Sequence, residues 1–220
     1  MLHQAQSIPR ERRGRVATPL HRPYRHPRSG SHEEYKYLPR TGAQYKFNIG
    51  SVDTFRASIA EHCVKEYGVQ IINDVSGGQA DEHMYSIAAL LGVPYILTHT
   101  GGSQWNTSVF NLASRINELH LMGMNDIIID PGFGFGKTLD ENYHLMAHLE
   151  ELHMLRCPLL VGVSRKSMIY NLLQNIPEEA LNGTTALHTI ALMKGAHILR
   201  VHDVKAAVEA IKIVDKIHNS

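Results

Sequence analysis

The chain has 220 residues, 43% of them hydrophobic, and its 22 Lys and Arg against 21 Asp and Glu give a formal net charge of +1. This composition favours one soluble, globular domain and argues against disordered, collagen-like and disulfide-stapled classes. The charge is unevenly distributed, since residues 1–46 carry +7 and residues 47–220 carry −6. The sequence therefore joins a basic segment to an acidic one.

The basic segment, residues 1–46, holds eight Arg and five of the nine Pro and shows no sustained helical or strand period. Such a stretch does not build a core, so we expect irregular structure there. Clustered Arg attracts phosphate, but the segment has no folded nucleic-acid motif. Nucleic acid is therefore the least favoured partner.

The sequence also bears on location. No apolar run approaches the roughly 20 residues of a membrane-spanning helix, and Pro9 and Arg10 stand where a secretory signal needs its apolar core. We therefore expect a cytoplasmic protein without a membrane partner. Cys63 and Cys157 have no second Cys at metal-ligand spacing, so both are expected to be buried or partly buried free thiols.

From Phe47 onward, short runs rich in Ile and Val alternate with longer stretches whose apolar residues recur three or four apart. The short runs predict six strands, over residues 47–54, 69–75, 94–100, 126–130, 158–164 and 197–203. The longer stretches predict helices over residues 56–67, 81–91, 109–122, 140–155, 183–194 and 205–218, with a short extra helix over 167–174. This alternation indicates a parallel sheet with right-handed crossovers, in an α/β barrel or a doubly wound sheet.

Polar side chains gather at one place in every unit of this pattern. They lie at or just beyond the carboxyl end of each predicted strand: Asp53, Thr54, Asn73, Asp74, His99, Asp130, Ser164, Arg200 and His202. In a barrel that rim is where chemistry is assembled. One such residue can simply cap the next helix, whereas a complete series favours a functional site.

The segment over residues 130–138 invites comparison with a phosphate-binding loop. That motif requires a glycine where Pro131 stands, so the spacing fails by one residue. What remains is the Asp130 carboxylate at a strand end, followed by a flexible turn that lets the backbone approach a ligand and presents an aromatic ring. A capping role is the structural alternative for Asp130.

Two later segments carry cationic groups. Residues 162–167 end a strand and open a helix, so their hydroxyl and N–H groups can face an anion, although a solvated basic turn is the ordinary alternative. Arg200 and His202 lie two residues apart and are expected on one face of the last strand. Together they suit a phosphate or pyrophosphate, while His202 alone could be a core histidine.

Residues 51–56, 72–78, 130–138, 161–167 and 200–204 resemble, in order and spacing, five signatures of dihydropteroate synthases. The resemblance implies a (β/α)₈ TIM barrel, with residues 47–220 forming a pterin-binding barrel domain that retains strands three to eight. It implies a transferase of folate biosynthesis that condenses 6-hydroxymethyl-7,8-dihydropterin diphosphate with p-aminobenzoate, giving 7,8-dihydropteroate and pyrophosphate. It also implies a Mg²⁺ cofactor, a homodimer and a sulfonamide target.

The resemblance assigns substrate-binding roles to nine residues: Asp53, Asn73, Asp130, Phe135, Gly162, Lys166, Ser167, Arg200 and His202. The two Asp and the Asn hold the pterin edge, the Gly lies beside the ring, the Phe separates the substrates, and the Ser lies near the aminobenzoate. Catalytic roles fall to Lys166, which bonds the pterin carbonyl, and to Arg200 and His202, which anchor the diphosphate. No residue is assigned as a metal ligand.

The sequence departs from the family pattern in two places. Thr98 precedes His99 where the family has Met, which replaces a polarizable pterin contact with a shorter polar side chain. Neither the family's magnesium-binding Asn nor its Thr-Arg-Pro loop is found in residues 1–50. A pterin-binding but catalytically impaired paralogue is therefore the alternative. A methyltransferase using a methylated pterin is disfavoured by the signatures at residues 164–167 and 200–203.

Overall fold

The computed structural model describes residues 15–17, 50–101 and 105–220. Its strands are β1 (Arg15–Ala17), β2 (Ser51–Asp53), β3 (Ile71–Asp74), β4 (Tyr95–Thr98), β5 (Ile127–Asp130), β6 (Leu160–Val161) and β7 (Ile198–Arg200). Its α-helices are α1 (Ala57–Tyr67), α2 (Met84–Leu91), α3 (Trp105–Leu121), α4 (Leu139–Ala147), α5 (Ser167–Leu173), α6 (Leu181–Met193) and α7 (Val204–His218). Two 3₁₀ segments are η3 (Leu149–Leu155) and η4 (Pro177–Glu179).

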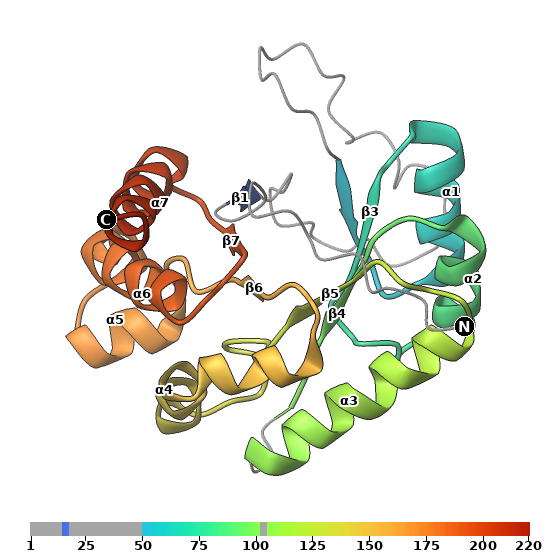
Figure 1. The fold of residues 1–220 in the computed structure, drawn as a ribbon, viewed down its shortest axis with the longest axis horizontal. Helices are drawn as coiled ribbons and strands as arrows, with labels where there is room; N and C mark the ends of the chain where they lie inside the picture. Colours follow the sequence, from blue (N-terminus) through green and yellow to red (C-terminus); the bar gives the residue numbers. More distant parts are fainter. Residues whose placement is uncertain (1–14, 18–49, 102–104) are drawn as a thin grey trace.

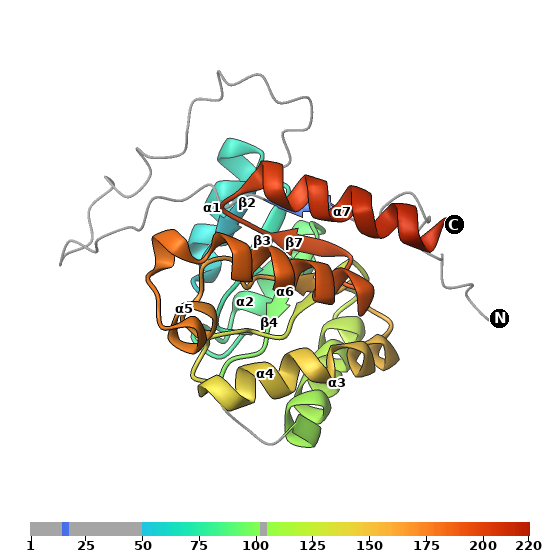
Figure 2. The ribbon, with the colours of Figure 1, turned by 90° about the vertical axis from the view of Figure 1, so that its left-hand side faces the viewer.

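All strand pairs are parallel. Strands β2, β3, β4 and β5 pair in that order, and β1, β7 and β6 form a second group. A bridge between Ile129 and Leu159 links the two groups. The helices lie outside the strands (Figure 1), and α6 and α7 pack side by side (Figure 2). The expected α/β architecture with a parallel sheet is confirmed, and the six predicted strands correspond to β2 through β7.

The strands form where the sequence is rich in Ile, Val and Leu because both faces of the sheet are covered. All four residues of β4 are buried, and Ile129, Val161 and Leu199 on the following strands are fully buried. Parallel strands that are enclosed by helices have continuous apolar sequences, in which apolar and polar residues do not alternate. The polar residues at their carboxyl ends are the exceptions to this pattern, and they form the site.

A capping box fixes the start of α4. The Thr138 hydroxyl accepts a hydrogen bond from the Glu141 N–H, and the Glu141 carboxylate accepts one from the Thr138 N–H. This reciprocal pair satisfies two backbone donors that a helix start leaves without partners. It anchors one end of the loop over residues 131–137, while β5 anchors the other.

The predicted helix over residues 140–155 is divided in the structure. It ends at Ala147 and continues as η3. A 3₁₀ helix repeats every three residues, which places Leu149 and Leu152 in line, and both are buried. Both leucines therefore face the core from the same side of η3.

The prediction of irregular structure over residues 1–46 lies outside the described residues, except for β1. Arg15–Ala17 forms a short strand beside β7. The N–H and C=O groups along β7 favour pairing with a neighbouring segment whatever its local propensity. Cys63 is buried and Cys157 is partly buried, and both are free thiols, as predicted.

Within the part of the chain that the structure describes, no helix combines the length and the apolar character needed to cross a membrane.

Candidate active site

Five polar side chains converge where the parallel strands end. We call them the strand-end cluster: Asp53 of β2, Asn73 of β3, Asp130 of β5, Lys166 after β6, and Arg200 of β7. Each was predicted from the sequence as a site residue. They come together because carboxyl ends of parallel strands meet at one rim.

Asp53 is held from two sides. The Asn73 side-chain amide donates a 2.7 Å hydrogen bond to one carboxylate oxygen, and the Arg200 guanidinium forms an ion pair with the other. Asn73 is 3% exposed, and its Oδ1 has no hydrogen-bond partner among the described residues. A buried acceptor without a partner is costly, so this atom suits a ligand N–H.

Asp74, beside Asn73, has a different role. Successive strand residues face opposite sides, so Asp74 faces away from the cluster. Its carboxylate is fully buried and accepts hydrogen bonds from the Tyr95 hydroxyl at 2.6 Å and from the Ser76 and Gly78 N–H groups. Asp74 therefore shapes the turn after β3.

Asp130 is the most buried carboxylate of the cluster, with 4% of its surface exposed. Burial raises the pKa of Asp130, while the Lys166 charge, the Gly132 N–H, the Arg200 charge and the Lys137 charge oppose that rise. The Gly132 N–H donates to Asp130 Oδ1 at 2.8 Å. The carboxylate thus has a fixed orientation.

Lys166 lies over the loop that follows β5. Its Nζ donates to the Phe133 carbonyl at 2.5 Å and lies 5.0 Å from the centre of the Phe135 ring. Burial lowers the pKa of Lys166, the Asp130 charge opposes this, and the Arg200 charge adds to it. A cation and an aromatic ring therefore share one side of the rim.

The loop over residues 131–137 approaches the end of β4 closely. Gly132 has a φ of 72°, and a Cβ built on it would lie 1.9 Å from the His99 carbonyl oxygen. Only glycine fits this approach. Lys137 secures it by donating from Nζ to the Gly132 carbonyl at 2.9 Å, and burial lowers the pKa of Lys137 to about 8.

Lys137 was not among the residues predicted from the sequence. Its partners are backbone carbonyls, which no side-chain pattern reveals. The neighbouring His99 is also buried, which lowers its pKa to about 4. Both residues line a cavity of about 430 Å³, together with residues of α3, α4 and η3, and the cavity shares no lining residue with the strand-end cluster.

The remaining predicted residues lie around the cluster. Gly162 faces Arg200, whose Cβ would lie 3.6 Å from a Cβ at that position. Ser167 begins α5 directly after Lys166. His202 is exposed, and its N–H and Nδ1 lie 3.2 and 3.0 Å from the Ser164 hydroxyl. Because β7 ends at Arg200, strand alternation does not extend to His202, which contacts Ser164 while Arg200 contacts Asp53.

The described residues do not by themselves form a magnesium site. Among residues 15–17, 50–101 and 105–220, no group of three or more His, Cys, Asp or Glu side chains could hold a metal ion. These residues alone do not fit Mg²⁺, which prefers several oxygen ligands in octahedral geometry.

Comparison with known proteins places this geometry in a family. The profile of the family described as "Pterin binding enzyme" matches residues 20–202. The dihydropteroate synthase of Escherichia coli K12 is 39% identical over 179 residues, which is 75% of this chain. The chain spans 63% of the length of that relative.

Solved structures of dihydropteroate synthases also resemble this chain. A Yersinia pestis dihydropteroate synthase with a sulfonamide drug is 38% identical, with a TM-score of 0.73 over 79% of this chain and 68% of that one. The Thermus thermophilus dihydropteroate synthase in complex with 6HMPPP is 37% identical, with a TM-score of 0.70 over 76% of this chain and 69% of that one. The chain therefore belongs to the pterin-binding enzyme family, in the branch of the dihydropteroate synthases.

Proposed function

We propose that this chain is a dihydropteroate synthase, acting on 6-hydroxymethyl-7,8-dihydropterin diphosphate and p-aminobenzoate. The observation that carries the proposal is the strand-end cluster, in which two carboxylates, an amide with a buried unpartnered acceptor and two cations share one rim. A heteroaromatic ring with several N–H groups and an anionic tail matches that set of groups.

The carboxylates and the amide hold the pterin. Asn73 Oδ1 accepts a pterin N–H, which satisfies the buried acceptor. Asp130, oriented by the Gly132 N–H, accepts a second one, and Asp53 accepts at the edge of the ring. Negative carboxylates also stabilise the positive charge that develops on the pterin as its leaving group departs. Gly162 leaves room beside the ring.

The cations hold the leaving group and the pterin carbonyl. Arg200 binds the diphosphate with paired hydrogen bonds, exchanging part of its ion pair with Asp53 for the more highly charged ligand. His202, on the neighbouring loop, adds a second donor, and Lys166 donates to the pterin carbonyl. The carboxylates thus lie at the pterin end of the breaking bond, and Arg200 and His202 lie at the diphosphate end.

The second substrate lies on the side of the rim where Phe135 and Lys166 meet. The Phe135 ring separates the aminobenzoate from the pterin, and Ser167 lies near its carboxylate. In the reaction, the C–O bond between the pterin methylene and the diphosphate breaks, and pyrophosphate leaves with the electron pair. The amine nitrogen then forms the new C–N bond and releases a proton to solvent.

Four further expectations stay predictions: Mg²⁺ at the diphosphate, a homodimer, a cytoplasmic location and the division of the chain at residue 47. The sulfonamide complex of the Yersinia pestis relative supports the proposal that sulfonamides compete for the aminobenzoate position here. The match to the family profile begins at residue 20, within the basic segment.

Product formation tests the proposed function. The full chain is incubated with both substrates, with and without magnesium, and 7,8-dihydropteroate and pyrophosphate are measured. Equal formation of the two products supports the proposal. Folded protein that gives no product, yet binds the dihydropterin diphosphate by calorimetry, would support the pterin-binding paralogue instead. Absence of both turnover and binding would contradict both functions.

A further inference from the structure

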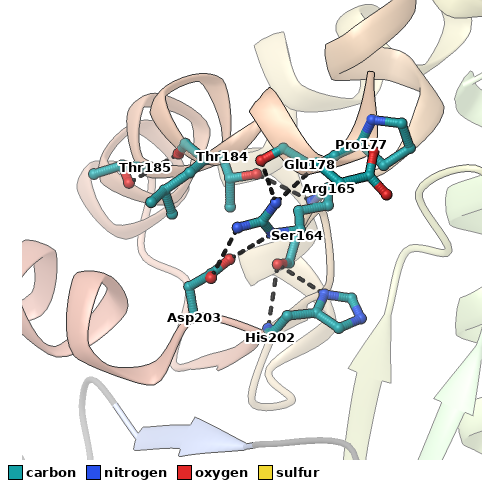
Figure 3. Close-up of polar contacts among 9 residues, drawn as sticks. Ser164, Arg165, Pro177, Glu178, Thr184, Thr185, His202 and Asp203 are labelled. Atoms are coloured by element: carbon teal, nitrogen blue, oxygen red, sulfur yellow. Dashed lines mark hydrogen bonds and ion pairs between the residues drawn. The ribbon is translucent and has the colours of Figure 1, made fainter. Parts of the chain in front are cut away.

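The side chain of Arg165 connects loops that carry proposed substrate-binding residues (Figure 3). Its Nε and Nη2 donate to the two carboxylate oxygens of Asp203 at 2.8 and 3.0 Å. Its Nη1 donates to the carbonyls of Pro177 and Glu178 at 2.8 and 2.7 Å. Four of the five guanidinium N–H groups are therefore used, and the fork geometry of arginine suits the bidentate contact with Asp203.

The backbone of Arg165 is also unusual. Its φ is 52°, in the left-handed region that a non-glycine residue enters at a cost of roughly 1–2 kcal/mol. Its N–H donates to the Thr184 hydroxyl at 3.0 Å. Such a conformation persists where surrounding contacts over-determine it. The contacts to Asp203, Thr184 and η4 are numerous enough to do so.

The residues next to this contact are the ones that the proposed reaction uses. Lys166 follows Arg165 directly, and the left-handed turn lets its side chain reach the Phe133 carbonyl. On the other loop, His202 precedes Asp203. Its N–H donates to the Ser164 hydroxyl, so the two loops meet a second time one residue away. The pair of contacts sets the position of the loop after β6 relative to the loop after β7.

We propose that Arg165 and Asp203 form a positioning clamp that holds Lys166 and His202 in register for the dihydropterin diphosphate. The inference rests on the proposed function and extends it to two residues outside the proposed substrate-binding set. Each charge favours the other: Asp203 raises the pKa of Arg165, and Arg165 lowers the pKa of Asp203. Both groups of the clamp are therefore charged at neutral pH.

Arg165→Lys tests the clamp because it keeps the charge and loses the fork. Misplacement of reacting groups by about 1 Å can cost about 100-fold, so we expect kcat/KM for the dihydropterin diphosphate to fall about 10- to 100-fold. By nuclear magnetic resonance, the His202 amide should exchange faster with solvent than in the unsubstituted chain. The affinity for inorganic pyrophosphate should fall as well.

A double-mutant cycle separates the clamp from general loss of structure. Asp203→Asn should reproduce the effect, and the Arg165→Lys, Asp203→Asn double variant should be no worse than either single one, because both remove the same contact. Arg156→Lys is the matched control. Arg156 is also left-handed, with a φ of 55°, but it ends η3 and is exposed. Its substitution should leave exchange and turnover unchanged.

The outcomes distinguish the clamp from the proposed function. Absence of turnover by the unsubstituted chain overturns the proposed function, while amide exchange and pyrophosphate affinity still report on the clamp. Arg165→Lys protein with unchanged His202 exchange, pyrophosphate affinity and kcat/KM overturns the clamp. Additive losses in the double variant overturn it too.

Discussion

The Asn73 side-chain amide donates a 2.7 Å hydrogen bond to the Asp53 carboxylate, joining the ends of two adjacent strands. The two residues are register partners in the β2–β3 pair, which explains their proximity. The bond orients Asn73 so that its Oδ1 remains a buried acceptor without a partner in the described part of the chain. This buried acceptor is suited to a ligand N–H.

Asn73→Ala should weaken binding of the dihydropterin diphosphate. The variant loses an acceptor for the ligand and the bond that orients Asp53, and a buried hydrogen-bonding contact is worth about 1–3 kcal/mol, or roughly 5- to 150-fold in affinity. Calorimetric titration measures the change. Asn125→Ala, at an exposed position before β5, is the control and should bind like the unsubstituted chain. Equal affinities for both variants would exclude Asn73 from the site.

The close approach at Gly132 gives a second prediction. Gly132→Ala must move the His99 carbonyl, whereas Gly123→Ala, at a φ of 87° with nothing within 4 Å of the new Cβ, adds only backbone strain. We expect Gly123→Ala to cost about 1 kcal/mol of unfolding free energy, and Gly132→Ala at least about 2 kcal/mol more. Chemical denaturation measures both. Equal losses would show that the loop yields to the added methyl group.

These residues show how far the sequence could predict the site. The strand-end polar residues were predictable because the apolar runs predict parallel strands, and the ends of such strands share a rim. The loop contacts were not predictable. Lys137 binds backbone carbonyls, and Gly132 is required by the His99 carbonyl, which lies 33 residues earlier in the chain. The Arg165–Asp203 contact likewise joins loops 38 residues apart.

Some features of the fold were also not predictable from the sequence alone. Strand alternation could not decide which of Asn73 and Asp74 faces the rim, since both follow the same apolar run. In the structure, Asp74 accepts a hydrogen bond from the Tyr95 hydroxyl and faces away from the rim, so Asn73 is the residue that faces it. The strand at Arg15–Ala17 had no local signal either, and it forms beside β7.

Buried histidines predict an acid-sensitive fold. Burial lowers the pKa values of His99 and His188 to about 4, below the ordinary value of 6.5. Both are neutral in the folded chain, so their contribution to stability is complete above pH 6.5 and is lost as pH falls toward 4. Each lowered pKa corresponds to about 3 kcal/mol of unfolding free energy. The melting temperature should therefore fall steadily over this range.

His188→Leu tests the histidine contribution. It removes one buried histidine that takes up a proton on unfolding, so the melting temperature should depend less steeply on pH between 6.5 and 4. His218→Gln, at the exposed end of α7, is the control and should keep the steeper dependence. Identical slopes for His188→Leu and the unsubstituted chain would contradict the prediction.

The most direct test of the central claim compares Lys166→Ala with Lys212→Ala in the formation of 7,8-dihydropteroate. Lys166 contacts the Phe133 carbonyl and the Phe135 ring, whereas Lys212 is exposed on α7. Loss of a charged hydrogen bond to the transition state costs about 2.7–4 kcal/mol, so Lys166→Ala should lower kcat/KM at least about 100-fold. Lys212→Ala should retain the unsubstituted rate. Full turnover by folded Lys166→Ala protein would contradict the assignment of the strand-end cluster as the active site.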